Sequence, residues 1–146
     1  NAQVCTMVSV GGADIDVPPG EGGPPNNDAN LSLIAYERCD GTVGGQLQDT
    51  IAGGIAIHAE VVCLYVSGKD AWITAAITHA NPHSVFGDDY DGVPINIRIR
   101  DNGKHKDDPP DQASFWFFAD SYSDCYYQWE YDLWDLNNGQ AQIKQR

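Results

Sequence analysis

Positive charge is scarce in this chain. Its 146 residues include 8 Lys and Arg against 21 Asp and Glu, which gives a formal net charge of −13. Nucleic acids and anionic membrane surfaces repel such a chain, so neither is an expected partner. A solvated acidic surface explains the excess in one interpretation and bound calcium in another, because most of the acidic residues are Asp, a turn residue that is also a calcium ligand.

Long hydrophobic runs and catalytic motifs are missing as well. No apolar stretch approaches the roughly 20 residues that a membrane span needs. No secretion signal is visible, and a first residue of Asn rather than Met is what we expect of a processed, secreted protein. The chain has no Gly-x-Ser-x-Gly elbow, and the abundance of Asp makes any single carboxylate pair uninformative. The sequence predicts a non-catalytic protein without direct membrane insertion.

The four cysteines lack the Cys-x-x-Cys spacing of zinc sites and thioredoxin-like redox pairs. Their even number indicates two disulfides, which leave no thiol for catalysis, and an extracellular or cell-surface compartment. Three connectivities are open. The preferred one joins Cys5 to Cys39, which belong to the first two expected strands, and Cys63 to Cys125.

Strand signals dominate the chain, and the clearest lie in residues 51–79. Two runs of alternating apolar and polar residues flank a turn at residues 67–70, which is the pattern of a long β-hairpin. The apolar set changes face near Val62, so we expect a bulge or a sharp bend there.

Six other segments have the alternation or the composition of strands: 1–10, 31–37, 42–49, 93–100, 112–119 and 140–144. Gly and Pro fill residues 11–28, which we expect to form a surface loop. In the strand 93–100 three Ile should point inward while Asn96, Arg98 and Arg100 face outward. The segment 112–119 is apolar on both faces, which predicts a central or covered strand.

About eight strands separated by turn signals predict a single all-β domain over residues 1–146. The expected architecture is an antiparallel β-sandwich, or a partly open barrel, held by two disulfides.

The order of these segments resembles a known family. The stretches DGTVGGQLQ, IAIHAEVVCLYVSGKDAWITA, IRIRDNG with PPDQASFWF, and LNNGQAQIK are similar to the secreted bacterial β-domain that follows choice-of-anchor modules, the post-choice-of-anchor domain. The resemblance spans nearly the whole chain. It implies a structural or binding module with no established catalytic activity. Residues 120–134, rich in aromatic side chains, depart from the family pattern.

Two acidic loops flank the strand 93–100 and predict calcium sites. Their candidate ligands are Asp88, Asp89 and Asp91 in the first loop and Asp101, Asn102 and Asp111 in the second. A straight strand of this length holds the loops roughly 25 Å apart, so two separate sites are expected. Asx-turns that hold the loops are the alternative. The four His, in contrast, are expected to be ordinary surface residues.

An aromatic segment is the other candidate site, with the expected binding residues Tyr126, Tyr127, Trp129, Tyr131 and Trp134. If they are exposed, these rings can stack on carbohydrate or contact another protein; if they are buried, they cap an open end of the sandwich.

The sequence therefore predicts a non-catalytic structural or adhesive domain of the cell surface, whose partners are other copies of itself or other surface proteins. Self-assembly into a filament or coat, by a terminal strand donated to an open sheet edge, is one form of that role. A carbohydrate-binding module that uses the aromatic segment and a calcium-dependent binding domain are the alternatives.

Overall fold

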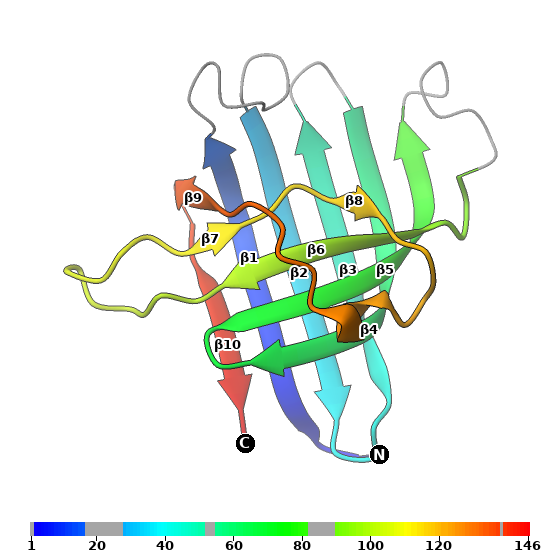
Figure 1. Ribbon diagram of the computed structural model, residues 1–146, viewed down its shortest axis with the longest axis horizontal. Coiled ribbons are helices and arrows are strands. Elements are labelled where there is room, and N and C mark those ends of the chain that lie inside the picture. Colours follow the sequence, from blue (N-terminus) through cyan, green and yellow to red (C-terminus); the bar gives the residue numbers. More distant parts are fainter. Residues whose placement is uncertain (1, 17–27, 52–54, 82–89, 138) are drawn as a thin grey trace.

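The computed structural model describes residues 2–16, 28–51, 55–81, 90–137 and 139–146. They form an all-β, antiparallel fold, as predicted (Figure 1). The elements are β1 (Val4–Asp16), β2 (Asp28–Arg38), β3 (Val43–Ile51), β4 (Ile55–Ser67), β5 (Asp70–Asn81), β6 (Pro94–Arg100), β7 (Gln112–Ala113), β8 (Phe117–Phe118), the 3-10 helix η2 (Asp124–Tyr127), β9 (Trp134–Asn137) and β10 (Ala141–Gln145). The ten described strands exceed the eight expected, because the 112–119 segment splits in two and β9 is additional.

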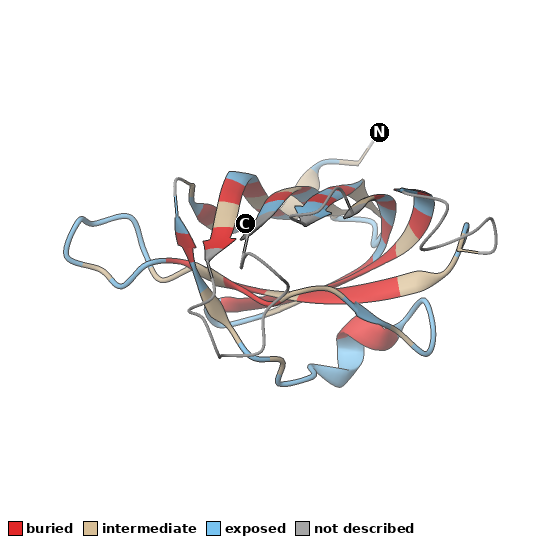
Figure 2. Cartoon of the chain, turned by 90° about the horizontal axis from the view of Figure 1, so that it is seen from above, coloured by how far each residue is buried: buried red, intermediate tan, exposed pale blue. Residues whose placement is uncertain are grey.

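The strands pair in chain order from β1 to β7. They make two layers that face each other (Figure 2). The first layer holds β10, β1, β2, β3 and the beginning of β4; the second holds the end of β4, the beginning of β5, and β6. On one side β4 and β5 cross between the layers, and on the other β9 pairs with both β7 and β1. The sandwich is thus joined along both sides, which gives it the character of a flattened barrel.

The corner in β4 lies where the sequence predicts it. The pairing of β4 with β5 shifts register between Val61 and Cys63, and again between His58 and Ala59. Strands that pass from one sheet to the other do so at such bulges. The extra residue also reverses the alternation, because Val61 packs in the central core whereas Cys63 faces the outer side of the second layer.

The core between the layers is built from aliphatic side chains on alternate positions of every long strand. Its largest fully buried members are Val8, Ile15, Leu31, Leu33, Leu47, Ile57, Ile73, Ile77, Ile95, Ile97 and Ile99. The inward orientation expected for the three Ile of β6 is therefore confirmed. On the other face of β6, Asn96 and Arg98 point away from this core but are not exposed, since Asn96 is only 4% accessible.

Two further expectations need correction. Strand β1 continues through residues 11–16 and pairs there with β2, although these residues were assigned to a loop. A bulge between Val10 and Ala13 accommodates the Gly pair, and Gly12 adopts the left-handed φ of +58° that glycine tolerates. The remainder of that predicted loop, residues 17–27, lies outside the described residues.

The second correction concerns residues 112–119, predicted to be one central or covered strand. They form the two-residue strands β7 and β8, each paired with β6. Phe117 and Phe118 of β8 are exposed. The prediction holds for the first half of the segment, since β7 lies between β6 and β9 and Ala113 and Ser114 are buried, and it is wrong for Phe117 and Phe118.

Both disulfides form in the preferred connectivity, Cys5–Cys39 and Cys63–Cys125. They indicate that the protein matures in an oxidising compartment. None of the described segments forms a helix long and apolar enough to cross a membrane.

Candidate binding surface

Residues 119–133 lie across the outer face of the second layer and form a partial third layer there (Figure 2). A small apolar cluster attaches them, in which the disulfide-bonded Cys63 and Cys125 pack with Trp72 and the half-buried Tyr65. The indole Nε1 of Trp72 donates a hydrogen bond of 2.9 Å to the carbonyl oxygen of Trp129. This covering segment is thus fixed by a covalent bond and by packing.

A buried polar network gives the covering segment a second attachment. Thr74 donates to the side-chain oxygen of Asn96 at 2.6 Å, and the Asn96 amide donates to Asp124 at 3.0 Å and to the hydroxyl of Tyr131 at 3.3 Å. Asp124, buried at the start of η2, also accepts a hydrogen bond from the backbone N–H of Asp120. Satisfied buried networks of this kind fix a single geometry. Burial raises the pKa of Tyr131, and the charges of Asp124 and Asp120 add to the effect of burial.

An ion cluster lies beside this network on the same face. Asp70 binds Arg98 at 2.7 Å and Arg100 at 2.6 Å. Arg98 also donates to the backbone oxygen of Tyr131 and lies over the ring of Trp72. Burial raises the pKa of Asp70, but the hydrogen bonds from the two Arg outweigh burial, so this pKa lies below its usual value. Arg98 therefore ties the covering segment to the sheet.

Aromatic rings are exposed on top of the covering segment and beside it. We call these rings the aromatic surface: Phe117, Tyr122, Tyr126, Tyr127 and Trp129. They are 44–68% accessible and are five of the nine large apolar side chains found exposed among the described residues. Phe118 is also exposed, but it pairs with the core-facing Ile95 and so points to the other face of the second layer. Clustering of this kind, unlike scattered exposed apolar residues, marks an interaction site.

The five aromatic residues singled out in the sequence divide between two environments. Tyr126, Tyr127 and Trp129 belong to the aromatic surface, whereas Tyr131 and Trp134 are half-buried. Tyr131 stacks on Phe117 at 4.6 Å, and Trp134 packs against the central core. The sequence analysis missed Phe117 because it assigned this residue to a covered strand.

The candidate calcium ligands are also distributed. Asp88 and Asp89 lie outside the described residues, and Asp91 is exposed in a turn before β6. Asp101, Asn102 and Asp111 come together where the loop after β6 meets β10.

Backbone N–H groups engage the carboxylate oxygens of the two Asp, and the Asn102 amide donates to the backbone oxygen of Pro110. Asp111 accepts from the N–H groups of Asn102 at 2.7 Å and Ala141 at 2.9 Å, and Asp101 accepts from those of Gly103 and Ile143 at 3.0 Å. Among the described residues no group of three or more His, Cys, Asp or Glu is placed to hold a metal ion. The carboxylates do what the Asx-turn alternative expects, and calcium remains a prediction.

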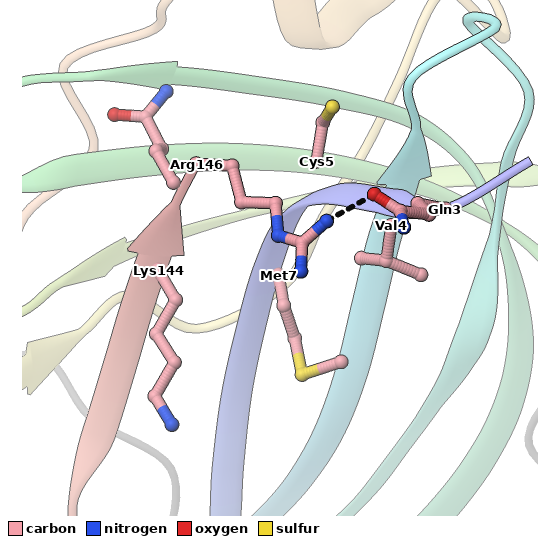
Figure 3. A pocket seen from close by; sticks show the side chains of 7 residues that line it. Gln3, Val4, Cys5, Met7, Lys144 and Arg146 are labelled. Atoms are coloured by element: carbon pink, nitrogen blue, oxygen red, sulfur yellow. Dashed lines mark hydrogen bonds between the residues drawn. The ribbon is translucent and has the colours of Figure 1, made fainter.

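The chain ends meet at a pocket of about 510 Å³ beside the start of β1 and the end of β10 (Figure 3). Arg146 reaches across to hydrogen-bond Gln3, while Lys144 points away from both. The lining residue Cys5 is held in a disulfide. No Asp, Glu, Ser, Thr or His is among the described residues that line this pocket.

One buried carboxylate in the core has no counterpart in the sequence analysis. Asp49 of β3 is 1% accessible, and neither of its oxygens has a hydrogen-bond partner of ordinary geometry. It lies in a row of inward-facing residues that is otherwise apolar: Ala13, Leu31, Asp49, Ile57 and Ala80. Burial raises the pKa of Asp49 to about 7, and the backbone N–H of Thr50 offsets only part of that effect.

The histidines that the structure describes lie at the surface, as expected. His58 and His79 are neighbours on β4 and β5 with ring centroids 6.4 Å apart, and His105 is exposed in a loop. His83 lies outside the described residues.

No family model, no curated protein and no solved structure matches this chain. The functional argument therefore depends on the geometry described above.

Proposed function

We propose that this chain is a non-catalytic adhesive domain of the extracellular space and that it associates with a second copy of itself through the aromatic surface. The observation that carries the proposal is the concentration of exposed rings on the rigidly attached covering segment and on the adjoining Phe117. The two disulfides and the resemblance to the post-choice-of-anchor domain support an extracellular, non-catalytic role.

The composition of the aromatic surface favours a protein contact. Tyr and Trp are the residues most enriched where binding energy is concentrated in interfaces. Five half-exposed rings offer roughly 500 Å², more than half of the ~800 Å² that each partner of a standard interface contributes. The disulfide and the buried network hold the segment in place before binding, which lowers the entropy lost on association.

The relative orientation of the rings favours protein over sugar at this surface. A flat sugar platform needs coplanar free rings, but Tyr127 and Trp129 are tilted by 36° at 6.1 Å. Tyr131, expected to join them, is half-buried and has one face covered by Phe117. Most soluble oligomers are built from copies of one chain, so a second copy is the first partner to test.

Charge makes the proposed association depend on salt. Each copy carries a net charge of −13, and the exposed Asp120, Glu130 and Asp132 belong to the covering segment that carries the aromatic surface. Their repulsion is screened as the Debye length falls from about 10 Å at 0.1 M salt to about 3 Å at 1 M. Association should therefore strengthen as salt is added, whereas contacts that depend on ion pairs weaken.

Sedimentation velocity over a concentration series at low and high salt tests the proposal. The wild-type protein is expected to self-associate more strongly at high salt, and the Tyr127→Ala/Trp129→Ala variant to remain monomeric. Met7→Ala, which removes an exposed apolar side chain from the first layer, is the matched control and should behave as wild type.

Monomeric wild-type protein at every concentration and salt would overturn the proposal, as would association that the double variant retains. Repeating the series with a chelator tests the calcium prediction, because a calcium-dependent contact would weaken when the metal is removed.

A further inference from the structure

The outer face of the first layer is hollowed, unlike the covered outer face of the second. A groove of about 880 Å³ crosses β1, β2, β3 and β4. Its size is within the range of sites that hold small ligands or a few units of a polymer. Its polar lining comes from Ser9, Ser32, Gln46, Gln48, His58 and Glu60.

Strand register arranges these polar side chains in two neighbouring rows. Ser9, Ile34, Gln46 and Glu60 are successive partners across the four strands, and Ser32, Gln48 and His58 make the next row. Side chains directly opposite each other in antiparallel pairs are about 5 Å apart. The rows therefore place hydrogen-bonding groups at short, regular intervals across the groove.

The lining is nearly free of charge in a chain that is strongly acidic. Glu60 is the only Asp, Glu, Lys or Arg among the fifteen residues that line the groove, whereas charged residues make up 20% of the whole sequence. Gln amides and Ser hydroxyls each offer both donors and acceptors. Such a surface suits a ligand that is neutral and rich in hydroxyl groups.

Two adjacent glycines form part of the groove. The Tyr36 side chain lies so close over Gly44 that a Cβ there would be 2.5 Å from its hydroxyl oxygen, and a Cβ on Gly45 would collide with the backbone of Ile34. Glycine weakens a strand interior and marks places where another group approaches closely. The glycines let Tyr36 lie against β3 beside Ile34, which is 55% accessible, so the groove also offers apolar faces.

From this geometry we infer that the groove is a binding site for a neutral polysaccharide chain. The amide and hydroxyl rows bind the sugar hydroxyl groups, and the exposed Ile34 contacts the apolar C–H faces of the sugar rings, while Tyr36, whose ring carries the Arg38 guanidinium at 4.7 Å, borders the groove. The net charge of −13 disfavours anionic polysaccharides. This inference is independent of the proposed self-association, since the groove and the aromatic surface lie on different layers.

A titration followed by ¹⁵N nuclear magnetic resonance tests the inference, with cellohexaose, xylohexaose and mannohexaose as neutral probes and an oligogalacturonate as the anionic probe. We expect at least one neutral probe to shift the signals of Gln46 and Gln48, including their side-chain amides. The oligogalacturonate should shift them less or not at all.

Gln46→Ala/Gln48→Ala should weaken the binding of that probe about tenfold or more, because two hydrogen-bonding side chains are lost. The matched control is Thr50→Ala, which changes an exposed residue of β3 outside the groove and should bind as wild type. Because all three residues are exposed, these variants are expected to fold.

Three results would overturn the inference. They are no perturbation by any neutral probe at millimolar concentration, perturbations that map to Tyr127 and Trp129, and equal binding by the Gln46→Ala/Gln48→Ala variant. Signals of Gln46 and Gln48 that move on concentrating the protein alone, with no response to sugar, would instead assign the groove to a second copy of the chain.

Discussion

The strands of both layers alternate between inward and outward side chains, but the outer face of one layer is exposed and the outer face of the other is covered. On β3 the outward Gln46 and Gln48 are exposed and line an uncharged groove. On β6 the outward Asn96 and Arg98 are covered by residues 119–133, which carry the aromatic surface. The comparison shows that alternation decides which way a side chain points, whereas a distant segment decides whether it meets water.

The covered face is also the more strongly stabilised of the two. Its disulfide closes a loop of 62 residues, and its buried network and ion cluster connect three separate parts of the chain. The bare face has hydrogen-bonded rows of backbone, and none of the described segments covers it. We therefore expect substitutions on the two faces to differ in their effect on stability, which the following changes test.

The largest effect is expected from removing the disulfide that holds the covering segment. Cys63→Ser/Cys125→Ser should lower the free energy of unfolding by about 4 kcal/mol, the cost of the lost loop closure. The indole of Trp72 should also become accessible, which shifts its fluorescence to longer wavelength. Denaturant unfolding measures the first effect and emission spectra the second.

The matched control is Cys5→Ser/Cys39→Ser, which removes a disulfide over a shorter loop of 34 residues at the other end of the fold. It should destabilise the protein without exposing Trp72. Equal spectral changes in both variants would show that Cys63–Cys125 does not hold the covering segment.

The next effect concerns the core that both layers share. The Asp49 pKa is about 7 in the folded protein against an ordinary value of 3.8, so the folded state favours the protonated form. The free energy of unfolding should therefore be at its full value below about pH 4, where Asp49 is protonated in both states. It should decrease as the pH rises from there to about 7, because ionisation of the buried carboxyl is unfavourable. The gap between the two pKa values corresponds to a loss of up to about 4 kcal/mol.

Asp49→Asn should remove that pH dependence. The difference in the free energy of unfolding between the variant and the wild type separates the effect of Asp49 from the effect of net charge. Denaturant unfolding at several pH values measures it, and Asp91→Asn, an exposed carboxylate, controls for the loss of one charge. Parallel pH profiles for Asp49→Asn and wild type would contradict this account of Asp49.

Substituting one outward residue on each face compares the stability of the two faces directly. Asn96→Ala should cost about 2 kcal/mol, because Thr74 and Asp124 lose buried hydrogen-bond partners. Gln48→Ala on the bare face should change stability by less than about 0.5 kcal/mol. Thermal or denaturant unfolding checks both, and equal costs would remove the distinction between the faces.

On the covered face, a smaller effect than that of Asn96→Ala is expected at the ion cluster. Asp70→Asn should cost about 1 kcal/mol, since the pair with Arg100 is partly screened by solvent. Because the folded pKa of Asp70 is lowered, its contribution is present above about pH 4 and is lost as the pH falls through the lower folded value. The wild-type advantage over Asp70→Asn should vanish in acid, and a constant difference at all pH values would contradict the assignment.

Local patterns in the sequence were sufficient for much of the fold. The β4–β5 hairpin, its bulge near Val62, the inward Ile of β6 and the cysteine pairing were all expected from alternation and from the order of the strands. The first three features depend on neighbours along the chain or on adjacent strands, whereas the cysteine pairing was a preference among three connectivities, since Cys125 lies in the distant covering segment. The extension of β1 through Gly11 and Gly12 was missed because a bulge lets β1 continue where glycines usually end a strand.

The surfaces were harder to predict. The alternation of β6 does not indicate that residues 119–133 return to cover Asn96. An apolar run such as that at Phe117 and Phe118 has the same sequence pattern whether it is buried or exposed. Asp49 follows the buried Leu47 by two positions in β3, so alternation does place it on the inward face, but the sequence analysis gave this carboxylate no role. Contacts between distant segments determine the first two outcomes, and no local pattern encodes them.

The most direct test of the central claim is a dilution series of ¹⁵N-labelled protein at high salt. The account predicts that the indole signal of Trp129 and the amide signals of Tyr126 and Tyr127 move with concentration, while those of Gln46 and Gln48 stay fixed. Concentration-dependent shifts confined to Gln46 and Gln48, or no shifts at all, would contradict the claim that the aromatic surface is where this protein meets its partner.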